Sequence, residues 1–150
     1  MKNVKFLLSA ALVFLASAAL AQDFSAPQYA KWGATPEERE QNILNSNFLK
    51  ESCDNRDYDA AAHYLKGLID KIPDAAESIY QRGAVVYKNK INRAKSVAEK
   101  NMFIDSLMLM YDMRAQYFGD NVKPGKTAFI LDQKAREFLR YKPNDRKGIR

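Results

Sequence analysis

The sequence offers few side chains that could carry out chemistry, and they do not form a recognisable catalytic set. His63 is the only histidine and Cys53 the only cysteine. A hydrolytic triad or a zinc site needs several such groups brought together, and Asp59 is the only carboxylate one helical turn from His63. We therefore expect His63 to lie at the surface or to be partly buried. Cys53 has no intramolecular disulfide partner, and we expect it to be a packed thiol.

Residues 125–127 have part of the sequence of a phosphate-binding loop. Gly125-Lys126-Thr127 follows Gly119, but five residues separate the two glycines where the motif requires four. A helix rather than a strand is also expected before them. We therefore interpret the segment as a turn, with Thr127 as the N-cap of the next helix.

Paired carboxylates give no better evidence for an enzyme. Glu37-Glu38 lies at a predicted helix start, and Asp70 and Asp74 flank a predicted helix end. Helix ends account for both pairs without acid–base chemistry. The sequence thus predicts a protein that is not an enzyme, with no catalytic residue, no cofactor and no metal site.

Residues 1–21 have the pattern of a signal peptide. Lys2 and Lys5 precede an apolar run from Phe6 to Leu20, which ends in Ala19-Leu20-Ala21. The run is shorter than the roughly 20 residues needed to cross a bilayer, and its small residues fit a cleavage site. We expect cleavage after Ala21 and export to the periplasm or the medium, with no transmembrane segment left.

The charge of the chain is mildly basic. Lys and Arg number 24 against 18 Asp and Glu, and removal of Lys2 and Lys5 leaves 22 against 18, or about +4. Most basic residues are interspersed with acids, and only Arg140 to Arg150 is locally rich in them. Nucleic-acid binding usually needs a denser basic stripe, so no nucleic-acid partner is expected.

Apolar residues recur at steps of three and four along most of the chain, which predicts helices and no strand. The predicted helices cover residues 35–53, 57–72, 74–91, 94–118 and 127–141. Residues 22–34 are expected to form an extended lead whose aromatic side chains dock on the first helix. Residues 35–143 then form one helical domain, and residues 144–150 are either a tail or the start of a further helix.

Local signals refine these helices. Thr35 with Glu38, and Asp74 with Glu77, match the capping box. Gly83 lies inside the third helix and predicts the close approach of a neighbouring helix. The fourth helix is apolar on two faces, which predicts that it lies between two others. In the fifth helix we expect four residues to face inward: Leu131, Ala135, Phe138 and Leu139.

The segment from Asp57 to Pro73 resembles the second helix of a tetratricopeptide repeat, a unit of about 34 residues that folds as a helical hairpin. The residues that carry the resemblance are Tyr58, Ala61, Tyr64, Leu65, Leu68 and Pro73, with Gly83 as the small residue of the next unit. The match covers roughly residues 41–86. It weakens afterwards because the fourth helix is too long, and Leu49 replaces a small residue in the first. The chain is thus similar to a divergent tetratricopeptide array, and to uncharacterised exported repeat proteins of Bacteroides-like bacteria.

The resemblance implies an all-α array of antiparallel helical hairpins whose concave face holds a peptide or a partner domain. In the family the leading helix of a hairpin lines this face. The groove residues it implies here are Tyr80, Arg82, Tyr87 and Lys90. The leading hypothesis is therefore an exported module that binds protein or peptide in the cell envelope.

Two alternatives remain open at this point. One is a glycan-binding or glycan-processing envelope protein, in which Trp32 and exposed tyrosines would stack on sugars. The other is that the sequence is the N-terminal fragment of a longer repeat protein. That longer protein could be an enzyme whose active site lies beyond Arg150.

Overall fold

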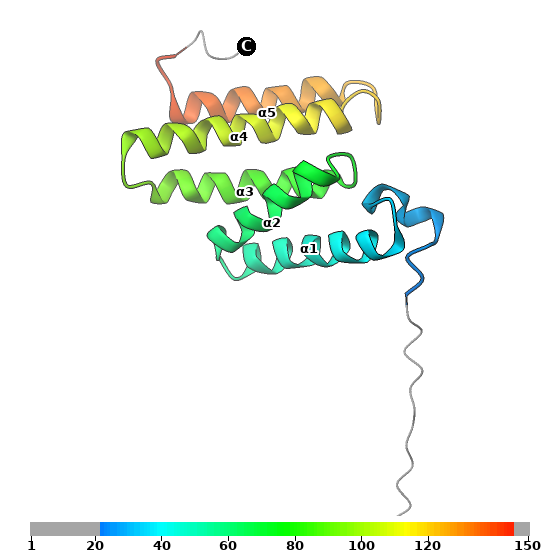
Figure 1. The fold of residues 1–150 in the computed structure, drawn as a ribbon. Helices are drawn as coiled ribbons and strands as arrows, with labels where there is room; N and C mark the ends of the chain where they lie inside the picture. The colour runs from blue at the N-terminus through cyan, green and yellow to red at the C-terminus, as the bar shows by residue number, and fades with distance from the viewer. Residues whose placement is uncertain (1–21, 146–150) are drawn as a thin grey trace, which may run out of the picture.

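A computed structural model describes residues 22–145, which form an array of packed helices (Figure 1). In chain order the elements are the 3₁₀ helix η1 (Pro27–Trp32) and the α-helices α1 (Pro36–Asp54), α2 (Tyr58–Lys71), α3 (Glu77–Arg93), α4 (Val97–Phe118) and α5 (Lys126–Tyr141). No strand occurs between residues 22 and 145, and the all-α prediction is confirmed. The predicted signal peptide, and residues 146–150 of the predicted tail, lie outside the described residues.

The first two helices begin at the capping residues that the sequence indicates. The Thr35 hydroxyl accepts a hydrogen bond from the Glu38 amide at 3.2 Å, and the Glu38 carboxylate accepts one from the Thr35 amide at 3.4 Å. Asp57 caps α2 in the same way by accepting from the Ala60 amide at 3.1 Å. These bonds satisfy amides that have no partner within the helix, so α1 and α2 start where expected.

Helices α3 and α4 each begin three residues later than predicted. Ala76, which has no side chain able to cap, precedes α3, so the predicted capping box of Asp74 and Glu77 is wrong. The Glu77 carboxylate instead forms ion pairs with α4 and α5. Helix α4 begins after Ser96, whose hydroxyl accepts from the Glu99 amide at 3.1 Å. A serine cap stabilises this start better than one at Ala94.

The start of α5 also differs from the prediction. Gly125 is the residue before the helix, and its φ of 79° lies in the left-handed region that favours glycine. Thr127 therefore lies within the first turn and does not act as the N-cap. Its hydroxyl accepts from the Asp120 amide, and its amide donates to the Asp120 carboxylate, each at 2.9 Å. These bonds close the α4–α5 loop.

The inward face of α5 was predicted only in part. Ile130 and Phe138 are buried, but Leu131 is 42 % exposed and Leu139 39 % exposed. The expectation that both leucines face inward is wrong, because α5 packs on α4 along a narrow face. Within that contact Lys134 forms a 2.5 Å ion pair with Asp112 of α4. A pattern of apolar residues alone does not reveal such a polar contact.

The N-terminal lead is folded rather than extended over residues 27–32, which form η1. Arg39 of α1 holds the lead, since its side chain donates to the carbonyls of Gly33 at 2.9 Å and Phe24 at 3.1 Å. Asn42, which is buried, donates to the Trp32 carbonyl at 2.8 Å. Trp32 packs against the core beneath it. The aromatic docking expected of Trp32 is present.

Two apolar cores hold the array together. The first is formed by α1, α2 and α3 with Met110 of α4, and the second by α3, α4 and α5. Helix α4 lies between α3 and α5 (Figure 1), so its second apolar face is used as predicted.

Gly83 lies where α2, α3 and α4 converge. A Cβ added there would lie 2.6 Å from Met110 Sδ and 3.1 Å from Leu65 Cδ2. A larger residue at this position would force Met110 or Leu65 to shift, so the glycine allows the close approach that the sequence led us to expect.

The order of the helices agrees with stacked hairpins at one end of the array and departs from it at the other. Helix α1 contacts both α2 and α3, as consecutive hairpins would. Helix α5 packs on α4 and reaches α3 through long side chains such as Glu137, which pairs with Lys88. The tetratricopeptide arrangement therefore stays a prediction. Within residues 22–145 no helix has the length and apolar character needed to cross a bilayer.

Candidate functional site: a groove over α4

A hollow of about 420 Å³ lies over α4, between α3 and α5. Met110, Tyr111 and Arg114 line it from α4, above the buried Tyr80 and Ala84 of α3. The remaining lining residues come from α3 and α5, and they are Gln81, Val85, Lys88, Phe129 and Gln133. We call this hollow the α4 groove. Because three helices contribute to it, the groove exists only in the folded array.

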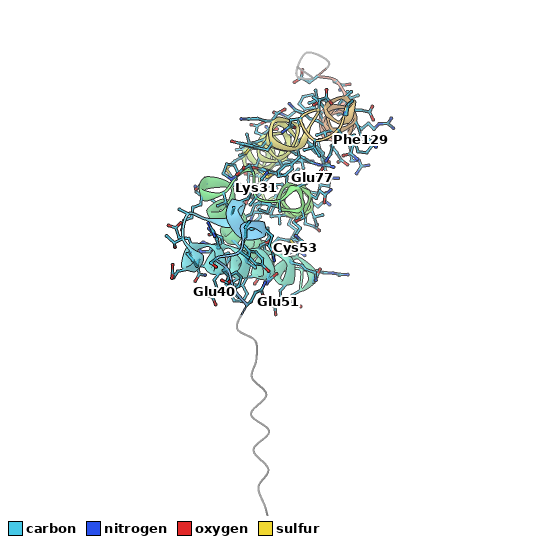
Figure 2. All side chains as sticks on the ribbon, turned by 90° about the vertical axis from the view of Figure 1, so that its right-hand side faces the viewer. Lys31, Glu40, Glu51, Cys53, Glu77 and Phe129 are labelled. Atoms are coloured by element: carbon cyan, nitrogen blue, oxygen red, sulfur yellow. The ribbon has the colours of Figure 1, made fainter. Side chains whose placement is uncertain are left out.

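Two apolar side chains lie on opposite walls of the α4 groove. Val85 of α3 is 45 % exposed and Phe129 of α5 is 57 % exposed. Phe129 projects near the α5 end of the array, and Glu77 lies below it at the start of α3 (Figure 2). Single exposed apolar residues are ordinary on protein surfaces. A pair on facing walls of one groove is a more specific feature, since both could contact the same bound side chain.

The α4 groove continues into two neighbouring hollows that share its walls. Phe129 also lines a hollow of about 440 Å³ with Lys123, Pro124, Gly125 and Lys126. Gln81 and Val85 also line a hollow of about 230 Å³ with Ser78 and Arg82. The combined surface therefore extends from α3 across α4 to the loop before α5.

An ion-pair network holds one end of the α4 groove. Glu77 accepts from Arg114 Nε at 2.9 Å and from Lys126 Nζ at 2.6 Å. Arg114 also donates to the Gln133 side chain at 2.9 Å. Burial opposes ionisation of Glu77, but the hydrogen bonds from Lys126 and Arg114 outweigh it and hold the pKa of the carboxyl below its usual value. The charged network thus fixes α3, α4 and α5 relative to one another.

A second ion pair lies further along the groove. Lys88 of α3 donates to Glu137 of α5 at 2.7 Å. Burial alone would lower the pKa of Lys88. The contacts with Glu137 and Tyr111 have a larger, opposite effect, so the pKa of Lys88 lies above its usual value. The second carboxylate oxygen of Glu137 has no hydrogen bond among the described residues, although Arg140 lies 3.5 Å away. Lys88 therefore stays charged at the wall of the groove.

The four groove residues implied by the repeat resemblance do not share one surface. Tyr80 lies beneath the α4 groove, 1 % exposed, and its hydroxyl donates to the Pro73 carbonyl at 2.6 Å. Arg82 lines the adjoining hollow on α3. Tyr87 and Lys90 line neither hollow, and both contact Phe103 of α4. Lys90 also pairs with Asp59 of α2.

The residues of the repeat resemblance occupy structural positions. Ala61, Leu65 and Leu68 of α2 are fully buried in the first core, and Tyr58 is 8 % exposed. Pro73 follows the end of α2 and accepts the hydrogen bond of Tyr80. Together with Gly83 they build the hairpin and do not contribute side chains to the groove.

The reactive side chains considered from sequence lie away from the groove. His63 is exposed on α2 beside Tyr64. Cys53 is half-buried against the first core, and burial raises the pKa of its thiol. No group of three or more His, Cys, Asp or Glu residues suited to a metal ion occurs within residues 22–145.

The glycan-binding alternative depended on Trp32 and exposed tyrosines as stacking platforms for sugars. Trp32 is half-buried and packs against the first core. Its ring is therefore committed to holding the N-terminal lead, and this feature does not favour sugar stacking.

Sequence reasoning missed most of the groove. Val85 and Phe129 appear in the sequence as ordinary members of amphipathic helices, and nothing marks them as exposed. Arg114 offered a usable signal, because it interrupts the long apolar pattern of α4. A buried arginine needs a carboxylate partner. That signal could have directed attention to the acids of neighbouring helices.

Comparison with protein-family models, with curated proteins and with solved structures gives no significant match to this chain.

Proposed function

We propose that the protein is a non-enzymatic binding module that holds a segment of a partner protein in the α4 groove. The observation that supports this most directly is the pair Val85 and Phe129, exposed on facing walls of a hollow that continues at both ends. Exposed apolar side chains at the centre of a groove, with polar side chains around them, are typical of peptide-binding surfaces.

The rigidity of the site supports the same function. The network of Glu77, Arg114 and Lys126 ties the three helices of the groove together. A preformed groove binds a flexible segment at a lower entropic cost than one that must order itself. Export to the cell envelope is part of the proposal and depends on the signal-peptide pattern of residues 1–21.

Selection of binders from a library of random short peptides tests the proposal. We expect the purified protein to enrich defined sequences, and Phe129→Ala to weaken their binding by about tenfold, as removal of a central contact does. Leu109→Ala is the matched control, since Leu109 is 50 % exposed on α4 and does not line the groove. Failure to enrich any peptide, or equal loss in both variants, would refute the proposal.

A further inference from the structure

The charges around the α4 groove are unevenly distributed. Within the described part of the chain, no acidic residue lines the groove or its two neighbouring hollows, and the two acids that pair with lining residues each contact two cations: Glu77 pairs with Arg114 and Lys126, and Glu137 with Lys88 and Arg140. The acids are also mostly covered, with side chains that are 24 % and 12 % exposed. Both of these carboxylates are therefore more than neutralised by their neighbours.

Two further cations lie at the ends of the combined surface. Arg82 lines the hollow on α3 and Lys123 the hollow before α5. Neither side chain forms an ion pair with any residue between 22 and 145. Their charges remain available to a bound molecule.

The whole chain segment that carries the groove also has an excess of positive charge. Residues 60–145 contain 15 Lys and Arg against 10 Asp and Glu, whereas residues 22–59 contain 4 against 8. The longer segment, which carries the groove, is thus net basic, and the shorter one, with η1, α1 and the start of α2, is net acidic. A field of this kind attracts anionic partners and disfavours cationic ones.

We infer that the α4 groove selects an acidic segment of a partner protein, with a bulky apolar side chain held between Val85 and Phe129 and carboxylates near Arg82 and Lys123. This inference rests on the proposed function and adds the chemical class of the ligand. A basic segment would place like charges beside Arg82 and Lys123, and a neutral one would leave both without partners.

The peptides enriched from the random library test the charge preference separately from binding itself. We expect the enriched sequences to contain Asp and Glu in excess of the starting library, next to a large apolar residue. Enrichment of neutral or basic sequences would overturn this inference and leave the proposed function intact. Absence of any enrichment would overturn both.

Charge-neutral variants test the two cations named. With an enriched acidic peptide as probe, we expect the double variant Arg82→Gln with Lys123→Gln to bind about three- to tenfold more weakly, and its affinity to depend less on salt. The control is Lys50→Gln with Lys66→Gln, which removes the same charge from exposed lysines of α1 and α2. Equal losses in the two double variants would overturn the inference.

A second copy of the chain is the competing occupant, because its acidic segment of residues 22–59 could supply the carboxylates. Analytical ultracentrifugation at low ionic strength, with and without the peptide, distinguishes self-association from peptide binding by the mass of the species in solution. We expect a monomer that binds the peptide. A dimer that the peptide dissociates would overturn the inference and assign the groove to self-association.

Discussion

Glu77 Oε1 accepts a hydrogen bond from Arg114 Nε at 2.9 Å, which joins the first residue of α3 to the C-terminal part of α4. The two residues are 37 positions apart in the sequence, and Arg114 is only 9 % exposed. A guanidinium this well covered needs a carboxylate beside it. The pair therefore explains why α4 accepts an arginine among its buried residues.

The substitution Glu77→Gln tests how much this pair contributes to the stability of the fold. The substitution leaves Arg114 and Lys126 without their carboxylate, and we expect the free energy of unfolding to fall by about 1–3 kcal/mol. Urea denaturation measures it. Glu51→Gln is the control, because Glu51 is exposed on α1 and should change stability by less than about 0.5 kcal/mol. Equal stability of the two variants would show that the ion-pair network makes no net contribution to the free energy of unfolding.

The same pair predicts a pH dependence. The pKa of Glu77 in the folded protein lies below its ordinary value of 4.5, so the folded state favours the ionised form. The stability that Glu77 contributes is then fully present above about pH 5 and is lost as the pH falls through the folded-state pKa. We expect the difference in stability between wild type and Glu77→Gln to be constant near neutrality and to shrink in acid. A difference that grows on acidification would contradict this.

The sequence predicted most reliably those features that depend on residues close together in the chain. Thr35 and Glu38 are three positions apart, and their capping box is present. The buried face of α2, with Ala61, Leu65 and Leu68, follows from its spacing. The start of α3 was misplaced because Glu77 serves Arg114 and Lys126 rather than its own helix. The start of α4 was misplaced although its cap is local, since Ser96 and Glu99 are only three positions apart.

The groove could not be predicted in the same way. That both Phe129 and Leu131 are exposed depends on which side of α5 packs on α4, and this side carries the buried Ile130 and Phe138 together with the Lys134–Asp112 ion pair. The spacing of apolar residues gives the width of the apolar face of a helix, but it does not show which other helices pack against that face. The groove residues are therefore known only once the three helices are assembled.

Removal of the Tyr80 hydroxyl tests the link between the α2–α3 loop and the first core. Burial raises the pKa of Tyr80 well above its usual value, so the hydroxyl stays protonated and donates to the Pro73 carbonyl. We expect Tyr80→Phe to lower stability by about 0.5–1.5 kcal/mol. Tyr64→Phe is the control, since Tyr64 is half-buried and its hydroxyl has no such bond among the described residues. A larger loss in Tyr64→Phe would contradict the assignment.

Two leucine substitutions test which faces are buried. Leu65 is fully buried, and Leu65→Ala should cost about 2–5 kcal/mol through lost contacts and the cavity left behind. Leu131 looks equally apolar in sequence but is 42 % exposed, and Leu131→Ala should cost less than about 1 kcal/mol. Thermal or urea unfolding of both variants measures the contrast. Similar losses would show that α5 is packed on a different face.

Two helical glycines offer the sharpest test of the packing. Alanine is the better helix former, so Gly67→Ala, with no atom within 4 Å of the added Cβ, should stabilise α2 by about 0.5–1 kcal/mol. Gly83→Ala gains the same propensity, but its Cβ would lie 2.6 Å from Met110 Sδ and 3.1 Å from Leu65 Cδ2. We expect overpacking to cost about 1–3 kcal/mol there and to reverse the sign. If both variants unfold at higher urea than wild type, α3 and α4 do not approach each other at Gly83 as closely as described.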